Sequence, residues 1–365
     1  MLKAFSASAV FDGASFHSNL AIIVEGDSIV QILPGEKLPG NIAHHFYENC
    51  MILPAFIDIQ VYGAQSRLFS LFPSVETLQL MAEKFLQSGT GLFQPTVATN
   101  AMGVIKKCID AVRLYKSTGN NAVHGLHIEG PWINPLKKGA HLEEYIHPPT
   151  GEEVKDLLEY GKGIITMITL APEICKKPII DLILSYDVKI SAGHSNASYA
   201  QSMQAFNGGV VAVTHLFNAM SNFHHREPGM PGAAFLHPAV KASIIPDGYH
   251  VDFHAVAIAK KILGERLFAI TDAVTVTVDG PYQHILNTDH YVCNGTLSGS
   301  ALSMYDAFFN LVTHAGIEKG EANRMCSLYP AQVLGLENRY GKIAPGYAGQ
   351  FLVIDKQLKL VEVIT

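Results

Sequence analysis

The sequence of 365 residues lacks paired cysteines, long apolar runs and clusters of basic residues. Its five cysteines are far apart, and such an odd, scattered set is typical of reduced thiols in a cytoplasmic protein. No apolar run is long enough to span a bilayer, and the N-terminal stretch has no signal-peptide core. The net charge is −6. We therefore expect neither a membrane nor nucleic acid as a partner.

The composition is that of a globular protein with a large core, because 48% of residues are hydrophobic and 16% are charged. In the middle of the chain, short apolar runs that end in polar residues alternate with segments of helical periodicity. About eight such units fit the roughly 250 residues of a (β/α)8 barrel. A doubly wound sheet is the alternative, but no Gly-x-Gly-x-x-Gly turn follows the first such strand.

Both ends of the chain have a different sequence pattern, which predicts short strands and turns. The stretch "LAIIVEGDSIVQILPG" predicts a hairpin, and the segment "GYAGQFLVIDKQLKLVEVIT" at the C-terminus is equally rich in strand-forming residues. We expect residues 1–52 plus 340–365 to form one small β-sandwich domain. Residues 53–339 would form the barrel. The predicted fold class is thus α/β, a TIM-type barrel with a small β domain built from both termini.

Chemistry in such a barrel is expected at the C-terminal ends of the strands. Four separate strand ends carry Glu129, His194, His215 and Asp272. A carboxylate and two imidazoles that converge there are typical ligands of a catalytic divalent metal. Asp272 would then be placed as the general base. The alternative is a hydrogen-bonded glutamate, two structural histidines and a capping aspartate, each common on its own.

The first barrel strand, "AFIDIQVYG", places Asp58, Gln60 and Tyr62 on one face. We interpret Asp58 as a hydrogen-bonded structural carboxylate and expect Gln60 to support the attacking water or the substrate. His127 lies two residues before Glu129 and on the same face of its strand. It would pack inside the barrel or orient a metal ligand.

Two further segments can bind an anion. The loop "FHHREPGMPGAAF" contains Arg226, and "PDGYHVD" contains His250. The guanidinium fork of arginine matches phosphate, which favours an anion clamp. The alternative is a solvated charge cluster on a surface loop.

Taken in order, "HIEGPWINPLKKGAH", "LAPE", "SAGHSNAS", "THLFNAMSNFHHREPGMPGAA", "DGYHVD", "TDA" and "NGTLSGSAL" resemble the N-acetylglucosamine-6-phosphate deacetylases of the metal-dependent amidohydrolase superfamily. The resemblance covers nearly the whole chain. It implies one divalent metal held by Glu129, His194 and His215. It also implies that Asp272 activates the water and then protonates the leaving amine, and that His141, in "KKGAH", polarises the carbonyl.

The same resemblance assigns the sugar phosphate to other residues. Asn218 and Ala219, in "FNAM", would contact the sugar, and Arg226 and His250 would contact the phosphate. In this family one side of the phosphate site tends to come from a neighbouring subunit, so the resemblance also implies a homodimer.

Two departures from the wider superfamily concern the metal. The first strand ends without His-x-His, and the fourth ends in "ITLAPE" without a lysine, so a second metal would lack ligands. We therefore expect a single ion, zinc or ferrous iron. Family members with one metal carry Gln-x-Asn on the first strand. This chain matches at Gln60 and departs at Tyr62, whose phenol would narrow the mouth or hydrogen-bond the substrate.

The sequence thus predicts hydrolysis of N-acetyl-D-glucosamine 6-phosphate to D-glucosamine 6-phosphate and acetate. The galactosamine epimer is a close alternative on the same chemistry. A non-catalytic sugar-phosphate binder, and an amidohydrolase acting on cyclic amides or nucleobases, are the alternatives of other classes.

Overall fold

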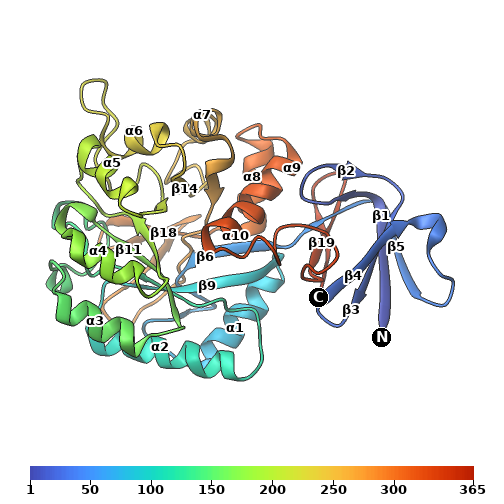
Figure 1. The fold of residues 1–365 in the computed structure, drawn as a ribbon, viewed down its shortest axis with the longest axis horizontal. Coiled ribbons are helices and arrows are strands. Elements are labelled where there is room, and N and C mark those ends of the chain that lie inside the picture. The colour runs from blue at the N-terminus through green and yellow to red at the C-terminus, as the bar shows by residue number, and fades with distance from the viewer. The chain divides into compact units, whose positions relative to one another are not determined.

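A computed structural model describes all 365 residues of the chain (Figure 1). The chain divides into two compact units. One contains residues 58–84 and 92–302, and the other contains residues 1–57, 85–91 and 303–365. The functional residues proposed above all lie in the first of these units.

Eight parallel strands form the barrel sheet, in the order β15-β14-β13-β12-β11-β10-β9-β6. The sheet is closed between its outer strands, because the amide of Asp272 donates to Gln60 O at 3.0 Å and that of Tyr62 donates to Ala273 O at 2.9 Å. The barrel prediction is therefore confirmed. The strands are β6 (Phe56–Val61), β9 (Thr90–Ala98), β10 (Leu126–Glu129), β11 (Ile165–Leu170), β12 (Lys189–Ala192), β13 (Ala212–Val213), β14 (Lys241–Ile244) and β15 (Leu267–Ala269).

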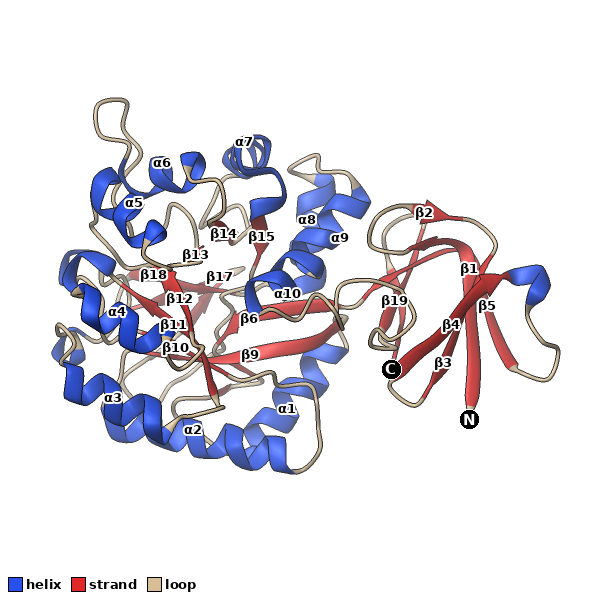
Figure 2. Ribbon diagram, in the orientation of Figure 1, coloured by secondary structure: helices blue, strands red, loops and turns tan.

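Helices follow the barrel strands and lie outside them (Figure 2). In α2, for example, the buried residues Ile105, Cys108, Ile109 and Val112 recur at helical spacing and form an apolar stripe. No helix is both long enough and apolar enough to cross a membrane. The helices are α1 (Val75–Leu86), α2 (Met102–Ser117), α3 (Gly151–Tyr160), α4 (Lys177–Leu184), α5 (Tyr199–Asn207), α6 (Gly229–Leu236) and α7 (Phe253–Leu263).

Two small antiparallel sheets decorate the barrel unit. The hairpin of β7 (Gly63–Ala64) and β8 (Arg67–Leu68) directly follows the first barrel strand. After the last barrel strand, β16 (Ile285–Asn287), β17 (His290–Cys293) and β18 (Thr296–Ser300) form a three-stranded sheet. Both sheets follow the C-terminal ends of barrel strands, where chemistry is expected.

The other unit joins the two ends of the chain in one seven-stranded sheet, with β19 paired to β5. The predicted hairpin is present, with Glu25 opposite Ser28 across a two-residue turn. The predicted fold class is therefore confirmed, whereas the domain boundaries 1–52 plus 340–365 and 53–339 stay a prediction. The elements are β1 (Leu2–Phe11), β2 (Phe16–His17), β3 (Leu20–Glu25), β4 (Ser28–Pro34), β5 (Ala43–Pro54), α8 (Met304–Thr313), α9 (Lys319–Cys326), α10 (Leu328–Leu334), β19 (Phe351–Asp355) and β20 (Leu360–Ile364).

Candidate active site

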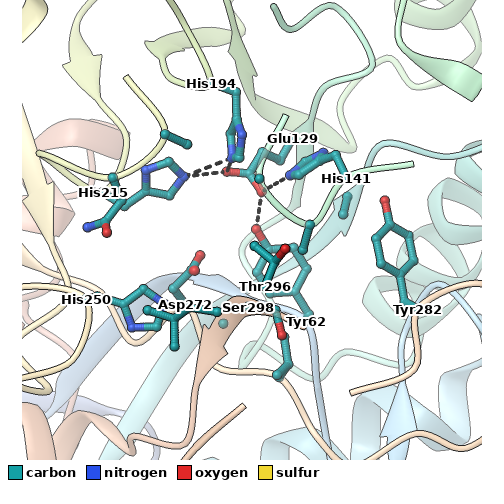
Figure 3. Close-up of a pocket in the computed structure, with 18 of the residues that line it drawn as sticks. Tyr62, Glu129, His141, His194, His215, His250, Asp272, Tyr282, Thr296 and Ser298 are labelled. Atoms are coloured by element: carbon teal, nitrogen blue, oxygen red, sulfur yellow. Dashed lines mark hydrogen bonds and ion pairs between the residues drawn. The ribbon is translucent and has the colours of Figure 1, made fainter. Parts of the chain in front are cut away.

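A cavity of about 350 Å³ opens at the C-terminal ends of the barrel strands (Figure 3). This volume is in the range of small-molecule binding sites. Most of the residues proposed from the sequence line it. They are Glu129, His141, His194, His215, Asn218, Ala219, His250 and Asp272.

Three of these side chains follow strand ends in a backbone conformation that few residues adopt. His194, His215 and Asp272 have φ values of 47°, 36° and 53°. Histidine and aspartate are among the residues that tolerate this left-handed region, which costs about 1–3 kcal/mol per residue and is concentrated at functional sites. The sharp turns after β12, β13 and β15 thus aim three polar side chains into the cavity.

Gly130 forms a similarly sharp turn after β10. Its φ is 82°, and a Cβ there would lie 2.1 Å from Thr99 Oγ1. Only glycine fits this turn without displacing the threonine.

Glu129, His194 and His215 bring three potential ligand atoms together. His215 Nε2 lies 3.2 Å from Glu129 Oε1 and 3.1 Å from His194 Nε2, and His194 Nε2 lies 3.4 Å from the same oxygen. Ligands bound tetrahedrally at about 2.0–2.1 Å are about 3.3 Å apart. The three atoms therefore have the spacing of one face of a tetrahedral metal site.

The hydrogen bond of His194 agrees with this role. His194 Nδ1 lies 2.8 Å from Lys137 O, and because a carbonyl only accepts, Nδ1 carries the proton and Nε2 presents its lone pair to the cavity. Burial by itself raises the pKa of Glu129, but the nearby imidazole of His194 and a hydrogen bond from His141 hold that pKa well below its usual range. The residues present therefore fit a divalent metal.

His141 offers a second grouping, because its ring nitrogen, Glu129 and His194 also lie within 4.8 Å of one another. However, the amide of Thr99 donates to His141 Nδ1 at 3.3 Å, which makes that nitrogen an acceptor. The proton then sits on Nε2, 3.2 Å from Glu129 Oε2, where it is donated to the carboxylate. We therefore prefer the triangle with His215. Burial, together with the nearby His194, lowers the pKa of His141 to about 4, so the ring is neutral.

Gln60 lies beneath the cavity and connects the two carboxylates. Its Nε2 lies 2.6 Å from Asp272 Oδ1, 3.0 Å from Glu129 Oε1 and 3.0 Å from Tyr62 Oη. Burial and, less strongly, the charge of Glu129 raise the pKa of Asp272. A carboxyl group with a raised pKa is suited to accept and return a proton near neutral pH.

The residues proposed for the sugar phosphate separate into two groups. Asn218, Ala219 and His250 line the cavity, and His250 Nδ1 is held 2.6 Å from Asp247 Oδ2. Arg226 does not line this cavity. It is exposed in the loop before α6, with its Nε 3.2 Å from His225 Nε2.

Several cavity residues were missed by reasoning from the sequence. Tyr282, His284, Thr296 and Ser298 come from the segment around the sheet β16-β17-β18. Tyr282 Oη donates to Thr99 O at 2.6 Å. No periodic pattern marks this segment, although "NGTLSGSAL" was among the motifs of the resemblance.

His127 lies inside the barrel, as expected. Its Nδ1 lies 3.1 Å from Ile59 O and its Nε2 lies 2.8 Å from Thr169 Oγ1. Burial lowers its pKa to about 4. The ring thus ties three strands together below the cavity.

Asp58 is fully buried and satisfied by hydrogen bonds. Its Oδ1 accepts from the amide of Gln60 at 3.2 Å, and its Oδ2 accepts from the hydroxyl of Thr271. Burial raises the pKa of Asp58 to about 7. Between about pH 3.8 and pH 7, the folded protein therefore keeps a proton on Asp58 that the unfolded chain has released.

We expect this carboxyl to make stability fall with rising pH. Because the folded pKa of Asp58 is above the unfolded value of 3.8, its contribution is fully present below pH 3.8 and is lost by about pH 7. The loss is at most about 4 kcal/mol of the free energy of unfolding. Urea unfolding at several pH values should show that Asp58→Asn removes this component. An unchanged difference between variant and wild type across that range would contradict it.

Comparisons with known proteins agree with this arrangement. Residues 51–364 match the model of the amidohydrolase family. An N-acetylglucosamine-6-phosphate deacetylase from Haemophilus influenzae is 34% identical over 357 residues, covering 94% of this chain and 92% of that protein. An N-acetylgalactosamine-6-phosphate deacetylase from Escherichia coli O157:H7 is 29% identical, covering 90% and 89%.

A solved structure gives the same picture. The crystal structure of N-acetylglucosamine-6-phosphate deacetylase from Pasteurella multocida superposes with a TM-score of 0.96 at 32% sequence identity, covering 100% of this chain and 98% of that one. The match includes the barrel and the terminal sheet alike. The chain therefore belongs to the amidohydrolase family and, within it, to the family of the N-acetylglucosamine-6-phosphate deacetylases.

Proposed function

We propose that the protein hydrolyses N-acetyl-D-glucosamine 6-phosphate to D-glucosamine 6-phosphate and acetate. The observation that carries the proposal is the convergence of Glu129, His194, His215 and Asp272 at one cavity of a chain 34% identical to such a deacetylase. Amide hydrolysis needs a nucleophile at neutral pH, stabilisation of the oxyanion, and a proton for the leaving amine.

A metal ion at this site would supply the first two of these requirements. Glu129, His194 and His215 would hold one divalent ion, which acts as a Lewis acid towards water and the amide carbonyl. Zinc and ferrous iron both suit two imidazoles and a carboxylate. His141 is proposed to polarise the carbonyl, for which its Nε2 proton would pass from the hydrogen bond with Glu129 Oε2 to one with the substrate.

Asp272 is proposed to move the proton. Gln60 holds its Oδ1, which leaves Oδ2 to accept a proton from the attacking water. The new C–O bond then forms, the C–N bond breaks, and the same proton passes to the amine nitrogen. One carboxyl group thus serves first as base and then as acid.

The phosphate end of the substrate is proposed to lie near His250, and its sugar ring near Asn218 and Ala219. Binding there, away from the amide, fixes the acetamide beside Asp272. Arg226 lies outside the cavity of its own chain, which supports the proposal that it reaches the phosphate site of a second copy in a homodimer. Light scattering of the purified protein tests the dimer. We also propose a cytoplasmic location, supported by five unpaired cysteines, four of them buried.

Acetate release tests the proposed function. Protein reconstituted with zinc or ferrous iron should hydrolyse N-acetylglucosamine 6-phosphate with a higher kcat/KM than its unphosphorylated analogue. The galactosamine epimer is the rival substrate, supported by the E. coli relative, and the ratio of the two kcat/KM values decides between them. Binding of either sugar phosphate without acetate release would instead show a non-catalytic binder. Turnover of cyclic amides alone would also overturn the proposal.

A further inference from the structure

Tyr62 contacts the proposed metal ligand Glu129 directly, which its position in the sequence did not reveal. Its hydroxyl donates a hydrogen bond to Glu129 Oε2, and both side chains are buried (Figure 3). Because a carboxylate oxygen only accepts, the phenol is the donor of this pair.

The other side of the same oxygen is occupied too. His141 Nε2 lies 3.2 Å from Glu129 Oε2, and the amide of Thr99 fixes the tautomer that donates. A carboxylate oxygen accepts through two lone pairs. Two donors therefore use the capacity of Oε2, and only Oε1 is directed at the imidazoles of His194 and His215.

The phenol is held firmly in this position. The amide of Tyr62 donates to Ala273 O at 2.9 Å, and its carbonyl accepts from Phe69 N at 2.8 Å. The ring packs in an apolar cluster with Leu68 and Val274. Gln60 Nε2 donates to Tyr62 Oη at 3.0 Å. Since that contact uses an acceptor site of the hydroxyl, its hydrogen is left to point at the carboxylate.

We propose that Tyr62 is a positioning residue that makes Glu129 a one-oxygen ligand of a single divalent ion. By occupying Oε2, the phenol also prevents Glu129 from bridging two ions. This role differs from narrowing the mouth or binding the substrate. The proposal for Tyr62 rests on the proposed metal site, but its test needs no substrate. The role of Tyr62 can therefore be refuted while the deacetylase activity is confirmed, and the activity can be refuted while the role of Tyr62 is confirmed.

The test is metal binding by the Tyr62→Phe variant. We expect apo Y62F to bind Zn²⁺ about 10–100-fold more weakly than the wild type, as is typical when a partner of a ligating group is lost. The visible absorption of the Co²⁺-loaded variant should also weaken, because a carboxylate free to bind through both oxygens raises the coordination number. Unchanged affinity together with an unchanged Co²⁺ spectrum would overturn the proposal.

A matched control removes the hydroxyl of another tyrosine in the same apolar cluster. Tyr291 belongs to that cluster but does not line the cavity, so Y291F should keep wild-type Zn²⁺ affinity and Co²⁺ absorption. If Y291F lowers the Zn²⁺ affinity as much as Y62F does, the effect is caused by altered packing and the proposal fails.

A measurement on the wild type covers the case in which Y62F does not fold. Electron paramagnetic resonance of Mn²⁺-saturated protein should show isolated ions at one per chain. A spin-coupled pair would demonstrate a bridging carboxylate and would overturn the proposal.

Discussion

Asp272→Asn is expected to lower kcat by about 10³–10⁴-fold while the protein keeps its metal. General acid–base catalysis contributes about 10²–10⁴-fold, and the upper part of that range is expected here because one carboxyl serves two proton transfers. The amide that replaces it can still pair with Gln60, so the cavity should keep its shape. The variant therefore removes a proton carrier more than it removes structure.

The pH dependence of the activity gives a second test of the role of Asp272. Burial raises the pKa of Asp272 above 3.8, and the ionised form is the one that accepts the proton. Activity of the wild type should therefore rise with pH through a value above 3.8. The residual activity of D272N should lack that rise, because no carboxyl titrates in its place.

Kinetics of acetate release and metal analysis of the same samples check the prediction. The matched control is Asp187→Asn, since the side chain of Asp187 is 94% exposed. It should leave kcat within a factor of about two, as is usual for exposed substitutions. If D272N retains more than a tenth of wild-type kcat, or loses its activity only because it loses its metal, Asp272 is not the proton carrier.

Much of the fold was predictable because local patterns dictate it. Alternating apolar runs and helical stripes predicted the barrel, and polar residues at strand ends predicted where the cavity lies. Strand ends in a closed barrel all face one side, so Glu129 and His215 could be expected to converge although 86 residues separate them. That inference needs only the order of the strands.

The partners of individual side chains could not be predicted in the same way. The strand period predicted that Tyr62 shares a face with Gln60, but its contact with Glu129 depends on the rotamer and on the closure of the barrel. Tyr282 enters the cavity from a segment with no period at all. Arg226 was predicted from its chemistry, yet its loop lies outside the cavity of its own chain. Long-range placement of loops is what the pattern of residues does not determine.

Removal of the metal is expected to abolish acetate release and to destabilise the protein. An ion that binds only the folded state stabilises it by about 4 kcal/mol when its concentration is 1,000 times Kd. Glu129 is buried to 2% exposure, and without the ion its charge would be met only by hydrogen bonds from neighbouring side chains such as Tyr62 and His141. Dialysis against a chelator should therefore lower Tm as well as kcat, and added zinc or ferrous iron should restore both.

His215→Ala should reproduce this loss without a chelator. Its Nε2 is the atom nearest to both other proposed ligands, at 3.1 Å from His194 Nε2 and 3.2 Å from Glu129 Oε1. Zn²⁺ affinity should fall by more than the 10–100-fold expected for a residue that merely supports a ligand. The control His254→Ala, whose side chain is 95% exposed, should bind Zn²⁺ like the wild type. Full Zn²⁺ affinity in H215A would indicate that His141, not His215, is the third ligand. The ring of His141 completes the other possible group with Glu129 and His194.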